Sequence, residues 1–201
     1  MQLFMANKQC GLVMGVALLL NACGGNSTLR FYMLEPVLAK SNSESVVNKN
    51  TLIGLGPIRL PEYLDRPQMV VAIADNQYQF DEHNRWAERL DQNLSRVLAQ
   101  QLAADLGVEQ VVRHPWAQRQ LIDYQITVDV LSFHQTVSGD NRLSAQWQLK
   151  QQEQTLLSKR FECLINADAS QTATMVKAQS QCVGQLGQAM VAALRSLANQ
   201  R

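Results

Sequence analysis

Hydrophobic and polar residues alternate most regularly along residues 121–137. From Ile122 to Val130 every second residue is hydrophobic and the residues between are polar, which is typical of a strand with one buried and one wet face. The alternation shifts at residues 131–133, which predicts a bulge. Two further strands follow, each behind a polar turn, at 143–149 and 156–165. These three strands are expected to form an antiparallel meander.

Two longer segments carry apolar residues at helical spacing: 82–106 and 168–200. In the first of them the apolar stripe begins at Trp86, and Gly107 supplies the C-terminal stop. Asp81 and Asn84 are its candidate N-caps. Because each helix has a single apolar stripe, both are expected to pack on a sheet in two layers rather than inside a sandwich.

Shorter β-rich segments complete the predicted sheet: 29–34, 51–60, 69–73, 78–80 and 108–112. Gly54 and Gly56 in the second of these do not indicate a phosphate-binding loop, since Pro57 continues an extended chain where a helix would have to begin. The sequence therefore predicts an α+β fold. We expect a single two-layer domain with a mostly antiparallel twisted sheet of about six strands and two long helices.

The N-terminal residues have the pattern of an export signal. Lys8 precedes the apolar run 11–20 without any acidic residue before it, and this run is about half of the ~20 residues that span a membrane. The run Leu20-Asn21-Ala22-Cys23 resembles the bacterial lipobox, in which the cysteine thiol receives a diacylglycerol, the leader is cut and the new amine is acylated. An ordinary signal peptide followed by a chance cysteine is the alternative.

The lipobox divides the chain into three parts: a removed signal peptide at 1–22, a lipidated tether at 23–30 and a folded domain at 31–201. The chain has 18 basic and 17 acidic residues, so the loss of Lys8 with the leader leaves 18 − 1 = 17 basic residues against 17 acidic ones. A balanced chain gives no argument for nucleic-acid binding. Membrane contact is therefore expected to come from the acyl chains on Cys23.

Catalytic and metal-binding patterns are missing from the sequence. His83, His114 and His134 lie on different predicted elements and have no partner at metal-ligand spacing. The sequence contains no Gly-x-Ser-x-Gly motif, and Asp123 and Asp129 are too far apart along one strand to form a catalytic pair. We therefore expect a protein that is not an enzyme and holds no cofactor or metal.

Two cysteines remain once Cys10 leaves with the leader and Cys23 is lipidated. Cys163 alternates with its inward-facing neighbours on the last strand, and Cys182 lies on the apolar stripe of the last helix. In an exported protein such a pair is a candidate disulfide. Two buried free thiols that act as small apolar residues are the alternative.

The most specific motif lies at residues 60–70, where Pro61 and Pro67 bracket a short turn. The run Leu60-Pro61-Glu62-Tyr63-Leu64-Asp65-Arg66-Pro67-Gln68-Met69-Val70 closely resembles a segment of the PqiC/YmbA family, the auxiliary lipoproteins of ABC-type intermembrane transport systems. Supporting matches are Phe31–Leu34, Trp86–Leu90, Asn93–Leu98 and Tyr124–Val130. The resemblance covers residues 23–197 and identifies 31–201 as an ABC-type transport auxiliary lipoprotein domain. Glu88-Arg89 departs from the family pattern without affecting its specific part.

The resemblance implies a function that the residues alone do not. Family members work with an inner-membrane integral protein and a periplasm-spanning MCE-domain protein to form a lipid route between the two membranes. The lipoprotein is non-enzymatic and sits at the outer-membrane end, on the periplasmic face. Gly24 fits this location, because an Asp after the lipidated cysteine looks like a signal for inner-membrane retention. Association into homo-oligomers stays open.

Tyr63, Leu64 and Arg66 in the turn are the candidate partner-binding residues, because Tyr and Arg are common interface anchors. In the alternative, the turn is only structural and Arg66 pairs with Asp65 or another nearby carboxylate. Two other functions fit less of the sequence. One is a periplasmic carrier that holds an acyl chain in its own cavity between sheet and helices, although both helix stripes look fully used in core packing. The other is a hydrolase of envelope lipid or glycan, which lacks a catalytic constellation.

Overall fold

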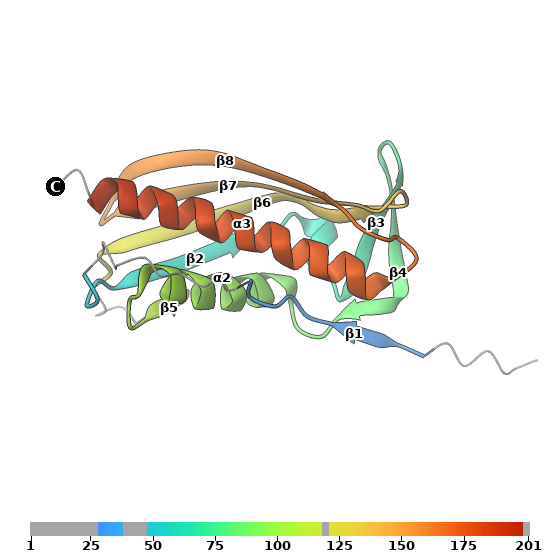
Figure 1. The fold of residues 1–201 in the computed structure, drawn as a ribbon, viewed down its shortest axis with the longest axis horizontal. Coiled ribbons are helices and arrows are strands. Elements are labelled where there is room, and N and C mark those ends of the chain that lie inside the picture. Colours follow the sequence, from blue (N-terminus) through green and yellow to red (C-terminus); the bar gives the residue numbers. More distant parts are fainter. Residues whose placement is uncertain (1–27, 38–47, 118–120, 199–201) are drawn as a thin grey trace, which may run out of the picture.

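The computed structural model describes residues 28–37, 48–117 and 121–198 and shows two long helices on one face of an eight-stranded sheet (Figure 1). This confirms the predicted two-layer α+β domain. Cys23 lies outside the described residues. The elements are β1 (Arg30–Tyr32), β2 (Ile53–Arg59), the 3-10 turn η1 (Glu62–Leu64), β3 (Gln68–Ala74), β4 (Gln77–Trp86), α2 (Leu90–Leu106), β5 (Val111–Arg113), β6 (Tyr124–Thr136), β7 (Asp140–Gln151), β8 (Gln154–Asn166) and α3 (Thr172–Ala198).

Strands β6, β7 and β8 form the predicted antiparallel meander. The register of β6 against β7 shifts between Val130 and Ser132, which is the bulge that the sequence predicted. Phe133 is consequently buried in the core beneath the helices. Because neighbouring residues of a strand point to opposite faces, His134 points to the face of the sheet away from the helices.

Strands β2 and β3 follow one another along the same edge of β6 and both run parallel to it. β7 occupies the other edge of β6 over its whole length. Between β2 and β3 the chain leaves the sheet, and this excursion contains the turn at residues 60–67. The short strands β1 and β5 add two more parallel pairings. The sheet is therefore mixed and has eight strands, more than the six expected and less antiparallel.

The first long helix begins eight residues later than the sequence predicted. Residues 82–86 belong instead to β4, whose end pairs in parallel with β1. Asp81 does not cap a helix but shapes a bulge in β4, where its carboxylate accepts hydrogen bonds from the backbone amides of His83 (2.9 Å) and Asn84 (3.0 Å). Trp86 packs from this strand against Phe133, with ring centroids 6.0 Å apart.

Helix α2 has no side-chain cap at its N-terminus and ends at Gly107, as predicted, in a left-handed conformation with φ of 66°. It packs closely against α3 where Gln101 meets two glycines. The Gln101 side chain donates a hydrogen bond to the carbonyl of Gly184 over 2.9 Å, and a Cβ atom at Gly187 would lie only 3.1 Å from Gln101 Cδ. Neither helix among the described residues is long and apolar enough to cross a membrane.

Large apolar side chains fill the layer between sheet and helices. Trp147 and Phe133 come from the sheet and Leu98 and Leu186 from the helices, and each is at most 2% exposed. Protein interiors of this kind are packed as densely as organic crystals. An acyl chain could enter the layer only by displacing these side chains, so the layer gives the carrier hypothesis no support.

Cys163 of β8 and Cys182 of α3 are joined by a disulfide with a Cα–Cα separation of 5.5 Å. That separation is within the usual range for a bridge. Cys163 is 6% exposed and Cys182 is fully buried. The bridge ties the edge strand of the meander to the helix that covers it.

Candidate functional site

The candidate site is built around the turn at residues 60–67, which is fixed by backbone hydrogen bonds. The amide of Leu64 donates to the Pro61 carbonyl over 2.9 Å, which closes the single turn η1. The amide of Trp86 donates to the carbonyl of Pro67 over 2.7 Å. Because Trp86 ends β4, this bond ties the exit of the turn to the β3–β4 hairpin.

Tyr63 leaves the turn toward the same hairpin and stacks on it. Its ring centroid lies 5.3 Å from that of Tyr78 on β4, and the Tyr78 ring meets the His134 ring edge-on at 5.3 Å. Burial, followed by the neighbouring Tyr78, raises the pKa of Tyr63 to about 12. The phenol is therefore neutral at physiological pH, and its hydroxyl already makes a hydrogen bond with the Phe133 backbone.

Arg66 lies flat over Phe80, also on β4, with its guanidinium carbon 3.7 Å from the ring centroid. The alternative in which Arg66 pairs with Asp65 does not hold, because Asp65 is bound by Arg89 at 3.4 Å. Within residues 28–37, 48–117 and 121–198, Arg66 forms no ion pair, and its buried Nε atom has no hydrogen-bond partner. The structure thus holds a guanidinium in place by stacking alone.

Leu64, the third candidate contact residue, is not accessible at the surface of the turn. Its side chain is 2% exposed and belongs to the hydrophobic core. The expectation that Leu64 contacts a partner directly is therefore wrong, because the side chain anchors the turn to the core instead. Tyr63 and Arg66 remain as the candidate contact residues.

A hollow of about 370 Å³ lies beside Arg66, between the turn and the start of α2. Most of the charged groups that line it are already paired. Glu88 accepts from Arg96 at 3.1 Å, and Arg89 is held by Asp65 and Asp91. Arg66 is the exception: within the described residues it is the charged lining residue that has no ion-pair partner, and it lies next to the buried Trp86.

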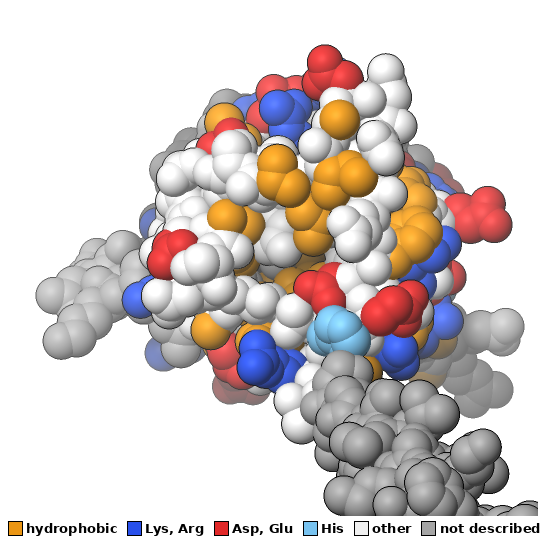
Figure 2. Space-filling model, turned by 90° about the vertical axis from the view of Figure 1, so that its right-hand side faces the viewer, with side chains coloured by type: hydrophobic (Ala, Val, Ile, Leu, Met, Phe, Trp, Pro, Cys, Tyr) orange, Lys and Arg blue, Asp and Glu red, His pale blue; other side chains and the backbone are white. Residues whose placement is uncertain are grey.

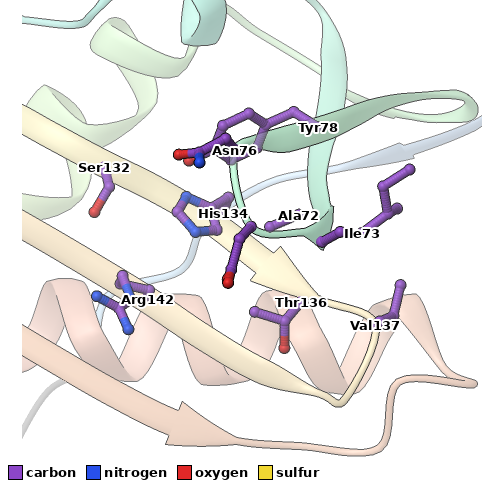
Figure 3. Close-up of a pocket in the computed structure, with 11 residues that line it drawn as sticks. Ala72, Ile73, Asn76, Tyr78, Ser132, His134, Thr136, Val137 and Arg142 are labelled. Atoms are coloured by element: carbon purple, nitrogen blue, oxygen red, sulfur yellow. The ribbon is translucent and has the colours of Figure 1, made fainter.

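A second pocket, of about 470 Å³, lies on the other side of Tyr78 (Figure 3). Ser132, His134 and Thr136 of β6 form its floor, while Arg142 enters from β7 and Tyr78 from β4. In the view of Figure 3, α3 lies behind the strands and these side chains lie in front, on the face away from the helices. Sequence reasoning missed this pocket, because a turn at 138–141 would put Val137 opposite Arg142, whereas the observed register puts His134 there.

The end of the molecule that carries the β3–β4 hairpin also exposes hydrophobic side chains, which gather in the upper part of the view in Figure 2. Large exposed apolar residues of the strands and turns near this end are Tyr78 (44% exposed), Phe80 (36%), Val137 (61%) and Leu164 (59%). Grouped apolar surface with a polar rim is typical of an interaction site. In the described ranges, no three His, Cys, Asp or Glu side chains are grouped so that they could hold a metal ion.

Comparison with known proteins gives matches over most of the chain. Residues 32–191 match the family model for the ABC-type transport auxiliary lipoprotein component. The intermembrane transport lipoprotein PqiC of Escherichia coli (strain K12) is 27% identical over 145 residues, which cover 72% of this chain and 76% of that protein, and PqiC of Shigella flexneri gives the same values.

Solved structures share the fold. The crystal structure of an uncharacterized protein matches with a TM-score of 0.70 and 24% identity, covering 83% of this chain and 99% of the other. The crystal structure of a Xanthomonas campestris protein also has a TM-score of 0.70, with 16% identity over 85% of this chain and 97% of the other. Both likenesses support the arrangement of sheet and helices described above.

Proposed function

We propose that this chain, which belongs to the family of ABC-type transport auxiliary lipoprotein components, docks the outer-membrane end of an intermembrane lipid route. The name of its Escherichia coli relative, an intermembrane transport lipoprotein, supports a role between two membranes. In this proposal acyl chains on Cys23 anchor the protein to the periplasmic face of the outer membrane. Gly24 supports that location, since it leaves the position after the cysteine free of an Asp.

The observation that carries the docking role is the unpaired Arg66. An arginine that is stacked on an aromatic ring and lacks a carboxylate keeps the donors of its two terminal amino groups free for a partner, although the Nε atom of Arg66 is itself buried. Tyr63 stands three residues away and offers the accessible part of a rigid ring that Tyr78 and the Phe133 backbone hold in place. Tyr and Arg are over-represented among the residues that dominate binding energy at interfaces. The turn therefore presents two such anchors beside a hollow that can receive a partner side chain.

The proposed partner is a periplasm-spanning MCE-domain protein, which in turn joins an inner-membrane protein. We expect its docking segment to offer a carboxylate to Arg66 and an apolar side chain to the hollow lined by Trp86 and Leu90. The role is one of binding and placement. No reaction is assigned to the chain, so we propose that it is not an enzyme.

Capture of the MCE-domain protein by the purified, lipidated protein tests this proposal. We expect the double variant Tyr63→Ala, Arg66→Ala to bind its partner about tenfold or more weakly, because two anchors are lost together. Biolayer interferometry would measure the affinity. Arg113→Ala is the matched control, since it removes one exposed arginine from β5 at the far edge of the sheet.

Thermal unfolding of the same variants separates binding from folding. Loss of the Arg66–Phe80 stacking is expected to cost about 0.5–1 kcal/mol, and loss of the Tyr63 ring from Tyr78 and the core about 2–3 kcal/mol more. The sum is below the stability of about 5–15 kcal/mol that is usual for a domain, so we expect the variant to stay folded at room temperature. Capture that is equal for wild type and double variant would remove the turn from the interface. So would an equal loss of affinity in Arg113→Ala.

A further inference from the structure

The pocket in Figure 3 brings together groups from three strands, and its polar groups on β6 and β7 have no part in the docking role. His134 of β6 and Arg142 of β7 are directly opposite one another in the antiparallel register. Tyr78 reaches the same place from β4 and meets the His134 ring edge-on. Ala72 and Ile73 of β3 and Val137 after β6 supply an apolar side.

The chemistry of His134 follows from its burial. His134 is only 7% exposed. Its Nδ1 atom is buried and has no hydrogen-bond partner among the described residues. Burial, and then the charge of Arg142, lowers the pKa of His134, so the ring is neutral at physiological pH. Since the enclosed Nδ1 has neither a donor nor an acceptor beside it among the described residues, Nε2 is the nitrogen that remains to bind a ligand. The site proposed below uses the tautomer in which Nε2 carries the proton.

Arg142 is the cation of this pocket, and none of the described carboxylates around it forms an ion pair with it. Glu162, on the next strand, is held by Arg160 at 2.8 Å. Asp140 accepts a hydrogen bond from Asn166 at 2.8 Å. Arg142 itself forms no salt bridge within the described part of the chain. Asp75, at the tip of the β3–β4 hairpin, is the one carboxylate that lines the pocket.

We propose that this pocket binds a phosphate ester. Arg142 and the Nε2–H group of His134 donate to the phosphate oxygens, with the hydroxyl of Ser132 as a third donor on the same floor. The organic part of the ester lies against Ala72, Ile73 and Val137. A phosphate ester fits better than a plain apolar ligand because it uses the donors, and an ammonium group in the same ligand would meet Asp75. The inference stands apart from docking, since its donors lie outside the turn; Tyr78 is the side chain that both sites share, because Tyr63 stacks on it.

The same chemistry can come from a lipid head group or from a soluble phosphodiester. Isothermal titration calorimetry on the mature lipidated protein in dodecyl maltoside would compare three probes: inorganic phosphate, glycerophosphoethanolamine and dihexanoyl phosphatidylethanolamine below its micelle concentration. Tighter binding of the short-chain lipid identifies a lipid head group as the source. Equal binding of the two esters identifies a soluble one.

Arg142→Ala is expected to weaken binding of the ester at least about tenfold, because a charged hydrogen bond is lost. Arg142→Lys should recover part of the loss. Lys159→Ala is the matched control, since it removes an exposed cation of β8 that forms no ion pair within the described residues and leaves the Arg160–Glu162 pair intact, and we expect a change below about twofold. The proposal is overturned if Lys159→Ala weakens binding as much as Arg142→Ala, if Arg142→Ala has no effect, or if the wild type binds none of the probes at millimolar concentration.

Discussion

Replacing Cys23 by serine is expected to remove the protein from the outer membrane almost completely. The serine hydroxyl cannot form the thioether that holds the diacylglycerol, so the acyl chains are lost together. Each buried CH₂ group of an acyl chain contributes about 0.8 kcal/mol to membrane binding, and one chain alone holds a protein only marginally. The balanced charge of the mature chain offers no second attraction to the membrane surface.

Mass spectrometry of the N-terminal peptide and fractionation of the two membranes would measure this result. In the wild type we expect the peptide to begin at Cys23 and to carry the acyl mass. Gly24→Asp is the matched control, because it should keep the acyl mass and move the protein to the inner membrane. An outer-membrane pool of Cys23→Ser equal to wild type would show that something other than the acyl chains holds the protein. An unmodified N-terminal Cys23 in the wild type would favour the ordinary signal peptide.

Loss of the Cys163–Cys182 bridge is expected to have the largest effect on stability. The two cysteines are 19 residues apart, and closing a loop of this length constrains the unfolded chain by about 3 kcal/mol. For a domain of this size we therefore expect Cys163→Ala, Cys182→Ala to melt about 6–12 °C below the wild type. Alanine keeps both buried positions apolar.

Urea unfolding with and without reductant separates the bridge from the side chains. In reductant the wild type and the double alanine variant should unfold with nearly the same free energy. Peptide mass spectrometry of unreduced protein should show Cys163 linked to Cys182. Free labelling of both thiols in denatured, unreduced protein would contradict the bridge, as would equal stability of wild type and variant without reductant.

The local rules explain which parts of the fold could be predicted. Gly107 ends α2, and the break in hydrophobic alternation after Val130 corresponds to a bulge. Both features were predictable because they depend on the residues at those positions and not on distant parts of the chain. Residues 82–86 were assigned to the wrong element, since Trp86 and Leu90 have helical spacing. Their strand conformation depends on pairing with β1, more than fifty residues away. Such parallel pairings join segments that are far apart in the sequence. The hydrophobic pattern of one strand does not show with which other strand it pairs.

For the candidate site, too, the sequence predicted the features that depend on local residues and not those that depend on contacts between distant segments. Two prolines mark the turn around Tyr63 and Arg66 in the sequence itself. Stacking of Arg66 on Phe80 requires the β3–β4 hairpin to bend back under the turn, which no local pattern encodes. The burial of His134 likewise depends on Tyr78 from another strand. Leu64 was placed at the interface because the sequence could not show that it faces the core.

Site-specific photo-crosslinking in intact cells tests the central claim, docking through the 60–67 turn, most directly. Glu62 is exposed and adjoins Tyr63, so p-benzoylphenylalanine at this position leaves both anchors in place. We predict a crosslink to the MCE-domain protein from position 62 that disappears when Tyr63→Ala and Arg66→Ala are added, and none from position 113. Equal crosslinking from positions 62 and 113, or no crosslink from position 62, would contradict the proposed docking surface.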